Sequence, residues 1–224
     1  DPAGGGLAVR RLILACSLLL ILTMLPGASA SAADGAEVYA STSRPLGASY
    51  VTWTERWFQW AFGTPVDTNP ISHPEGCTTN LHGSVWYMPH TFVGSAVKTH
   101  CTIPKGTSIL LAPGGALCDA TEAPDTWRSL RSCADLTWAS LYNFQVFIDG
   151  QELRNLEPFD VATPVFKISY PVNNLFDLRP GSYNAVATGR FVMLRPLTPG
   201  RHTIVVRDQS EDGTAQATAF LTVR

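Results

Sequence analysis

Charge and short catalytic motifs are both scarce in this sequence. Charged residues account for 15% of the 224 residues, the formal net charge is −2, and no basic stripe is present. Nucleic acid is therefore not expected as a partner. The G-x-S-x-G elbow, the H-E-x-x-H pair and the C-x-x-C pair are all absent. These absences argue against an α/β-hydrolase, a zinc protease of that class and a structural zinc site.

A single long apolar run is present, near the start of the sequence. Arg10 and Arg11 precede the apolar residues 12–25, Pro26 and Gly27 break the run, and small residues follow at 28–30. This layout is typical of a secretory signal peptide, and the run is shorter than the ~20 residues that a membrane span needs. We predict that residues 1–30 comprise upstream residues and a signal peptide. The mature protein is then secreted or periplasmic, with no stable membrane span.

Four cysteines remain in the exported part, and in such a compartment they are expected to form two disulfides. Three connectivities are possible. We favour the sequential pairing, in which the second bridge closes a loop of about 16 residues, worth ~3 kcal/mol in the chain-entropy model. The predicted pairs are Cys77 with Cys101 and Cys118 with Cys133.

The stretch SYVTWTERWFQWAFGTP, residues 49–65, predicts a helix. Thr52 and Glu55 match a capping box at its start, and Gly63 and Pro65 end it. Apolar side chains cover more than half of its circumference, which favours burial. Residues 31–48 are small and polar and are predicted to be a leader, so that residues 49–224 form a single domain.

The aromatic residues raise two alternatives, core packing or stacking on a flat ligand such as a sugar. A tight helical stripe is more typical of core, because large aromatic side chains are usually buried. Neighbouring residues in a strand point to opposite faces. We therefore expect at most one of residues 86 and 87 to be buried by the same sheet. The candidate ligand-binding residues are Trp53, Trp57, Trp60, Trp86 and Tyr87.

A second helix is predicted within residues 125–142, where Trp127 and Trp138 lie three turns apart and should share one buried stripe. Elsewhere, short β-prone segments alternate with Gly and Pro turns. Asp149-Gly150 predicts a hairpin, and residues 161–172 suit edge strands. The segments before and after TPGR are predicted to pair. The fold class is thus mainly β: an antiparallel β-sandwich, jelly-roll or Ig-like, with two packed helices and two disulfides.

Several segments together carry a resemblance to a family. The helix stretch quoted above, GSVWYM and LRPLTPGRHTI resemble a group of uncharacterised secreted bacterial proteins. That group has an N-terminal Trp-rich helix and a C-terminal PLxPGxHT strand pair. The resemblance implies an exported protein with this layout, and it implies no catalytic residues.

Three functions are compatible with these sequence features. The first is a non-catalytic binding or envelope-associated module for a glycan or an extracellular protein. The alternative is a secreted hydrolase of polysaccharide or ester bonds, which needs two carboxylates in a cleft or a Ser–His pair; Glu122 with Asp125, or Glu55 with Asp67, are possible pairs. A metal-dependent protein would need the histidines between 73 and 100 to converge. We favour the first function, with no cofactor or metal.

Overall fold

The structure is a computed structural model that describes residues 37–224, and these belong to one compact unit, Asp34–Arg224. The predicted signal peptide and the first part of the predicted leader lie outside the described residues. Within residues 37–224, neither helix is long and apolar enough to span a membrane.

Residues 37–224 form two α-helices and eleven strands, with three short 3-10 helices between them. The helical elements are η1 (Pro45–Gly47), α1 (Tyr50–Gly63), η2 (Val66–Thr68), α2 (Trp127–Ala139) and η3 (Glu157–Phe159). The strands are β1 (Leu81–His82), β2 (Val85–Tyr87), β3 (Ala96–Ile103), β4 (Ser108–Asp119), β5 (Tyr142–Ile148), β6 (Gln151–Glu152), β7 (Asp160–Ala162), β8 (Phe166–Tyr170), β9 (Gly181–Leu194), β10 (Gly200–Ser210) and β11 (Gly213–Val223).

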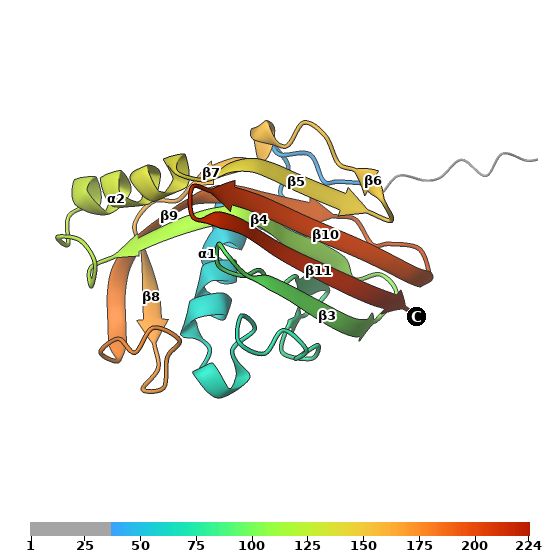
Figure 1. The fold of residues 1–224 in the computed structure, drawn as a ribbon, viewed down its shortest axis with the longest axis horizontal. Helices are drawn as coiled ribbons and strands as arrows, with labels where there is room; N and C mark the ends of the chain where they lie inside the picture. Colours follow the sequence, from blue (N-terminus) through green and yellow to red (C-terminus); the bar gives the residue numbers. More distant parts are fainter. Residues whose placement is uncertain (1–36) are drawn as a thin grey trace, which may run out of the picture. The chain divides into compact units, whose positions relative to one another are not determined.

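The strands form two sheets, which confirms a mainly β fold with two helices (Figure 1). Sheet A has the order β1-β2-β4-β9-β7, with β8 also paired to β9, and sheet B has the order β3-β11-β10-β5-β6. The sheets are not purely antiparallel as predicted, because β2 pairs with β4 and β3 pairs with β11 in parallel. The chain visits sheet B at β3 between β2 and β4, so β2 and β4 run the same way.

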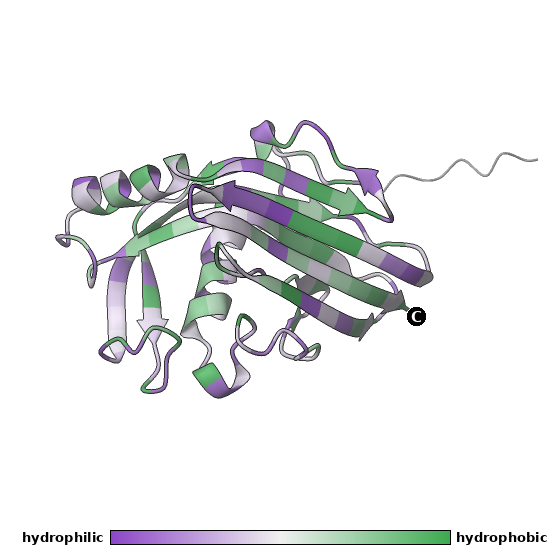
Figure 2. Ribbon diagram, in the orientation of Figure 1, coloured by the Kyte–Doolittle hydropathy of each residue, from purple (hydrophilic) through white to green (hydrophobic). Residues whose placement is uncertain are grey.

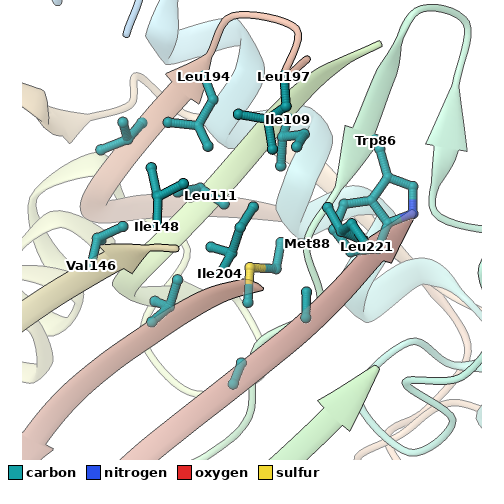
Figure 3. Close-up of a cluster of buried hydrophobic side chains, with 14 of the residues drawn as sticks. Trp86, Met88, Ile109, Leu111, Val146, Ile148, Leu194, Leu197, Ile204 and Leu221 are labelled. Carbon is teal, nitrogen blue, oxygen red and sulfur yellow. The ribbon is translucent and has the colours of Figure 1, made fainter. Parts of the chain in front are cut away.

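Two apolar layers hold these sheets. The layer between them is formed by alternate residues of both, including Ile109 and Val192 from sheet A and Ile204 and Leu221 from sheet B (Figure 3). Helix α1 covers the other face of sheet A, where Phe191 belongs to a separate cluster with the helix tryptophans. Sheet A is therefore covered on both faces. This explains why every residue of β9 from 185 to 194 is buried.

Helix α2 packs on sheet A through Leu130 and Ala134. It lies within the predicted range, but its tryptophans do not share a buried stripe. Trp127 is 59% exposed, whereas Trp138 stacks on Phe144 with the ring centroids 4.6 Å apart. Phe144 belongs to β5, so β5 supplies the stacking partner of Trp138 at the C-terminal end of the helix.

Local predictions had mixed outcomes. Asp149 and Gly150 form the predicted hairpin, with φ values of 52° and 81°, and β7 and β8 are the predicted edge strands beside β9. The N-cap of α1 is Ser49 rather than Thr52, because the Ser49 side chain accepts a hydrogen bond from the Thr52 backbone N–H.

The predicted strand pair around TPGR is wrong. β9 lies in sheet A and β10 lies in sheet B, so the TPGR segment carries the chain from one sheet to the other. β10 pairs instead with β11 through a two-residue turn between Ser210 and Gly213. β9 already has β4 on one side and β7 and β8 on the other.

The described part of the predicted leader packs on sheet A. Val38 forms an isolated antiparallel bridge with Leu194, and the Tyr39 backbone N–H donates to the Met193 carbonyl. Residues 37–48 therefore belong to the same compact unit as residues 49–224.

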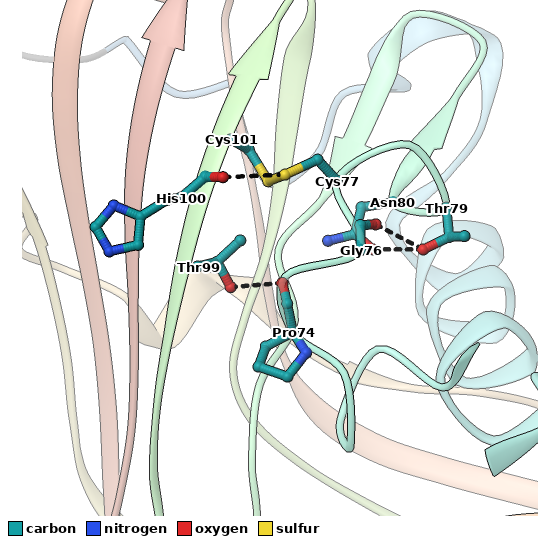
Figure 4. The surroundings of a disulfide bond; sticks show 8 residues. All are labelled: Pro74, Gly76, Cys77, Thr79, Asn80, Thr99, His100 and Cys101. Atoms are coloured by element: carbon teal, nitrogen blue, oxygen red, sulfur yellow. Dashed lines mark hydrogen bonds between the residues drawn. A yellow bond between two sulfur atoms is a disulfide. The ribbon is translucent and has the colours of Figure 1, made fainter. Parts of the chain in front are cut away.

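Both disulfides have the predicted sequential pairing. Cys77–Cys101 ties the turn-rich segment after α1 to β3 (Figure 4), and Cys118–Cys133 ties β4 to α2. The bridges span 24 and 15 residues of sequence. Each one fastens a helix or a loop to a strand, so the segments outside the two sheets are the ones most constrained by them.

Candidate ligand-binding surfaces

The three tryptophans of α1 are core residues. Trp53, Trp57 and Trp60 are 5%, 4% and 7% exposed. Each indole N–H donates to a backbone carbonyl: Trp53 to Pro45 at 3.0 Å, Trp57 to Met88 at 3.2 Å and Trp60 to Thr79 at 3.0 Å. Both the apolar rings and their polar ends therefore have partners within the protein, as buried indoles generally do.

Trp86 and Tyr87 point to opposite faces of β2, and both are buried because sheet A is covered on both sides. Trp86 lies between the sheets and is 0% exposed (Figure 3), while Tyr87 lies against α1 and is 2% exposed. Burial raises the pKa of Tyr87 to about 12, because an ionised phenol is disfavoured away from water.

A shallow groove of about 510 Å³ runs beside α1, and we call it the α1 groove. Its lining residues are Trp53, Arg56, Gln59, Trp60, Thr64, His82 and Tyr87. Its polar members largely contact one another or the backbone. The Arg56 guanidinium lies 4.8 Å from the Trp53 ring centroid, and His82 stacks on Tyr87 at 4.2 Å. Burial lowers the pKa of His82. The groove thus offers little free aromatic surface.

The outer face of sheet B presents a different arrangement. In the strand register His100 of β3 lies beside Phe220 of β11, which lies beside Thr203 of β10. The His100 and Phe220 rings stack with centroids 4.6 Å apart and planes 18° apart. Phe220 is 36% exposed. Its register neighbour on the other side is Thr203, a much smaller side chain than the His100 ring.

A hollow of about 440 Å³ lies over these strands, and we call it the Phe220 hollow. It is lined by His100, Cys101, Thr102, Arg201, His202, Thr203, Phe220, Leu221 and Thr222. His202 is engaged, since its ring nitrogens lie 2.7 Å from Asp149 Oδ2 and 2.8 Å from the Thr198 carbonyl. Within residues 37–224, the Arg201 guanidinium and the hydroxyls of the three lining threonines have no hydrogen-bond partner. They are free to meet a ligand.

The hydropathy of sheet B fits this division of its surface. Figure 2 shows β10 hydrophilic at both ends and hydrophobic in its middle. The hydrophilic start of the strand carries Arg201 and His202, at the Phe220 hollow. The apolar middle includes Ile204 and Val206, which face the layer between the sheets.

The histidines between 73 and 100 separate in the structure. His73 faces Glu75 at 3.4 Å, His82 stacks on Tyr87, His90 binds Asp208 and His100 stacks on Phe220. Among residues 37–224, the one group of potential metal ligands that comes together is Cys118, Glu122 and Cys133. Its two sulfur atoms are joined in a disulfide, which leaves a single carboxylate.

Three of the four acids in the predicted pairs have neighbours outside their pair. Glu122 lies near Asp119, and its pKa is raised by burial and then by the negative charge of Asp119. The buried Asp119 carboxylate accepts a hydrogen bond from the Tyr170 hydroxyl. Asp125 accepts instead from Asn184 at 2.8 Å, and Asp67 accepts from Asn173 at 2.8 Å. These acids hold loops in place.

The Phe220 hollow was missed from the sequence, although one signal was available. In ATAFLTV, Phe220 stands at an outward position of an alternating strand, between Thr218 and Thr222. An apolar ring on the polar side of such an alternation marks an exposed aromatic residue. Its stacking partner His100 is 120 positions away in the chain and meets it through the parallel pairing of β3 with β11, which the sequence pattern does not indicate.

Comparison with known proteins gives low similarity. No family model matches the chain, and no curated protein matches it significantly. Among solved structures, PbICP-C in complex with falcipain-2 has 12% identity and a TM-score of 0.28, over 63% of this chain and 100% of that one. Amebosin, in a solution structure, has 13% identity and a TM-score of 0.20, over 58% and 96%. Similarities this low carry no functional argument.

Proposed function

We propose that this protein is an exported, non-catalytic binding module that recognises a glycan in the Phe220 hollow. The observation that supports the proposal is the partly exposed Phe220 ring, which stacks on His100 at 4.6 Å beside hydroxyls that have no hydrogen-bond partner among residues 37–224. Stacking on His100 fixes the orientation of the ring before any ligand arrives. Ordering the ring in advance lowers the entropy lost on binding.

The chemistry of the hollow suits a sugar. A pyranose has an apolar face of C–H groups and an edge of hydroxyls. The first can pack on the Phe220 ring, and the second can exchange hydrogen bonds with Thr102, Thr203 and Thr222. A volume of about 440 Å³ lies within the ~300–1,000 Å³ that ligand sites commonly have.

The charge of the hollow favours an acidic glycan. Arg201 lines it and has no ion-pair partner among residues 37–224. A guanidinium binds carboxylates through two parallel hydrogen bonds. We therefore expect oligogalacturonides, which carry a carboxylate on each ring, to bind more tightly than neutral cello-oligosaccharides.

The binding experiment is calorimetric titration of the purified protein with both oligosaccharide classes. Phe220→Ala should weaken binding by about tenfold or more, equivalent to ~1.4 kcal/mol. Trp127→Ala is a control, because Trp127 is an exposed aromatic residue, at 59%, that lies outside the hollow. Arg201→Gln should remove the preference for the acidic ligand. Equal affinity of wild type and Phe220→Ala would refute the proposal, and binding of a protein partner alone would replace the glycan.

Export is a separate part of the proposal. It is supported by the signal-peptide layout of residues 10–30 and by the two disulfides, which are typical of oxidising compartments. Mass spectrometry of the protein recovered outside the cytoplasm should find an N-terminus at or near Ser31. An intact residue 1–30 segment on that protein would contradict cleavage.

The hydrolase alternative stays a prediction. Within the described part of the chain, the histidine nitrogens with side-chain partners bind carboxylates, in the pairs His73–Glu75, His90–Asp208 and His202–Asp149. None of these rings contacts a serine hydroxyl there. No observation favours hydrolysis over binding at the Phe220 hollow.

A further inference from the structure

A buried histidine–aspartate pair joins the two sheets at a distance from the Phe220 hollow. His90, in the loop after β2, places Nε2 at 2.6 Å from Oδ1 of Asp208 on β10. The two side chains are 10% and 4% exposed. A carboxylate only accepts hydrogen bonds, so Nε2 carries the proton that it donates to Asp208. The pair therefore fixes the orientation of the His90 ring.

The other ring nitrogen is left without a partner. His90 Nδ1 is buried and makes no hydrogen bond with any described residue. An unsatisfied buried polar atom costs about 1–3 kcal/mol and calls for a specific explanation, such as a bound molecule. Asn80 Nδ2, Trp86 Nε1 and Ser108 Oγ also lack partners, but these residues line none of the hollows described here. His90 does line a cavity.

That cavity has a volume of about 60 Å³, and we call it the His90 pocket. Its lining residues are Trp57, Phe58, Phe62, Ile71, His90, Thr91, Phe92, Ala112, Gly115 and Phe191. Apart from His90 and Thr91, every lining side chain is apolar or aromatic, or is a glycine. The pocket and the Phe220 hollow share no residue.

Exposed rings adjoin the His90 pocket. Phe92 is 47% exposed, and the neighbouring Phe176 is 36% exposed. The two ring centroids lie 6.0 Å apart, and Phe176 also packs edge-on against Phe62 at 4.7 Å. Partly exposed aromatic residues beside an apolar cavity are a common feature of ligand sites.

We propose that the His90 pocket is a second binding site, for a small neutral molecule with an apolar body and a terminal hydroxyl group. The hydroxyl would enter the pocket and pair with His90 Nδ1, and the apolar body would rest on Phe92 and Phe176. The Asp208 carboxylate, by fixing Nε2, leaves Nδ1 for the ligand.

The size and the chemistry of the pocket both select this class. A volume of about 60 Å³ is well below the ~150 Å³ of a cavity that holds benzene, so it has room for a hydroxymethyl group and too little for a whole ring. A hydroxyl is both a donor and an acceptor. It can therefore satisfy Nδ1 whether or not that atom carries a proton, which a carbonyl or an ammonium group cannot do.

The probe for this site is benzyl alcohol, compared with ethylbenzene, in which a methyl group replaces the hydroxyl. Each is titrated at equal concentrations into the ¹⁵N-labelled protein with both disulfides formed. Benzyl alcohol should shift the imidazole nitrogens of His90 and the amides of residues 90–94 in a saturable way. Ethylbenzene should bind at least about tenfold more weakly than benzyl alcohol, because it cannot make the buried hydrogen bond to His90 Nδ1.

A filling variant separates this pocket from other sites. Ala112→Val places two further methyl groups in the cavity and should abolish the shifts, while Ala116→Val, on the same strand outside the pocket, should keep them. If Ala112→Val fails to fold, nuclear Overhauser contacts from benzyl alcohol to the Phe92 and His90 rings of the wild type decide the matter. Equal shifts from the two compounds, no shifts, or shifts confined to the Phe220 hollow would overturn the proposal.

Discussion

The aromatic side chains on the outer face of sheet A are buried, whereas Phe220 on the outer face of sheet B is partly exposed. On the outer side of sheet A, Trp53, Trp57 and Trp60 are no more than 7% exposed, and their indole N–H groups donate to backbone carbonyls. On the outer side of sheet B, Phe220 is 36% exposed, and among residues 37–224 its ring stacks only on His100. The difference arises because a helix covers one sheet and nothing among residues 37–224 covers the other.

This difference shows that aromatic density in the sequence reflects the core and not the binding surface. The tryptophans crowd into one helix because docking that helix requires a large apolar stripe. An aromatic platform on a sheet needs only one exposed ring and the residues beside it in the register. Those neighbours come from the hairpin of β10 and β11 and from β3, which lies about 100 positions earlier in the chain.

The largest expected effect is the loss of stability when a buried tryptophan of α1 is removed. Trp57→Ala should destabilise the protein by about 3–5 kcal/mol, because it leaves a cavity under α1 and removes the hydrogen bond to the Met88 carbonyl. Trp127→Ala is the matched control, since Trp127 is 59% exposed, and should change stability by about 0.5 kcal/mol or less. Urea denaturation measures both. Similar losses in the two variants would contradict the assignment of α1 to the core.

The next effect is the loss of stability when the Cys77–Cys101 disulfide is removed. Cys77–Cys101 fastens the loop that supplies the Thr79 carbonyl to Trp60 onto β3, beside His100 (Figure 4). Replacing both cysteines by serine should cost about 3–4 kcal/mol, from the loop of about 25 residues that the bridge closes. Denaturation of the oxidised variant, compared with the wild type, measures this loss. A change below about 1 kcal/mol would mean that the unfolded chain is not constrained by the bridge.

A smaller effect is expected for the stacked rings of His100 and Phe220 on the exposed face of sheet B. In a double-mutant cycle of His100→Ala and Phe220→Ala, the stacked rings should show a coupling free energy of about 0.5–1 kcal/mol. The stability losses of the single variants should be modest because both rings lie at the surface. A coupling of zero would mean that His100 does not hold the Phe220 ring in place.

The smallest effect is a pH dependence in the α1 groove. Burial lowers the pKa of His82 below its ordinary 6.5, so folding favours the neutral ring. The associated stability is present above pH 6.5 and is lost as the pH falls through the lower pKa of the folded state. An NMR titration should place the His82 midpoint below 6.5. A midpoint at or above that value would mean that the ring is not desolvated.

Local chemistry accounts for much of the fold. The Trp helix, the second helix, the Asp149-Gly150 hairpin, the edge strands and the formation of two disulfides were all predictable, because each depends on residues close together or on the parity of cysteines. The separation of β9 from β10 was not, since a turn such as TPGR joins strands equally well within one sheet or between two. The docking of residues 37–48 on β9 was also missed, because a single bridge at Val38 leaves no periodic pattern.

The candidate site was less predictable, because contacts between segments far apart in the chain leave no local sequence pattern. Residues 53, 57, 60, 86 and 87 are candidates from the sequence because large rings can stack on ligands, but in the fold these rings are buried and have little exposed surface. His100, Thr203 and Phe220 become neighbours only through strand register. A pairing between β3 and β11 depends on how the whole chain crosses between the sheets, which no local window contains.

The most direct test compares the two aromatic regions in one spectrum. A ¹H–¹⁵N correlation spectrum resolves the indole N–H groups of Trp53 and Trp60 from the backbone amides of β3, β10 and β11, while an oligogalacturonide is added. We predict saturable shifts in the strand amides around Phe220, unchanged indole signals, and loss of the strand shifts in Phe220→Ala. Shifts of the indole signals with no change around Phe220 would place the ligand at the α1 groove and contradict the account.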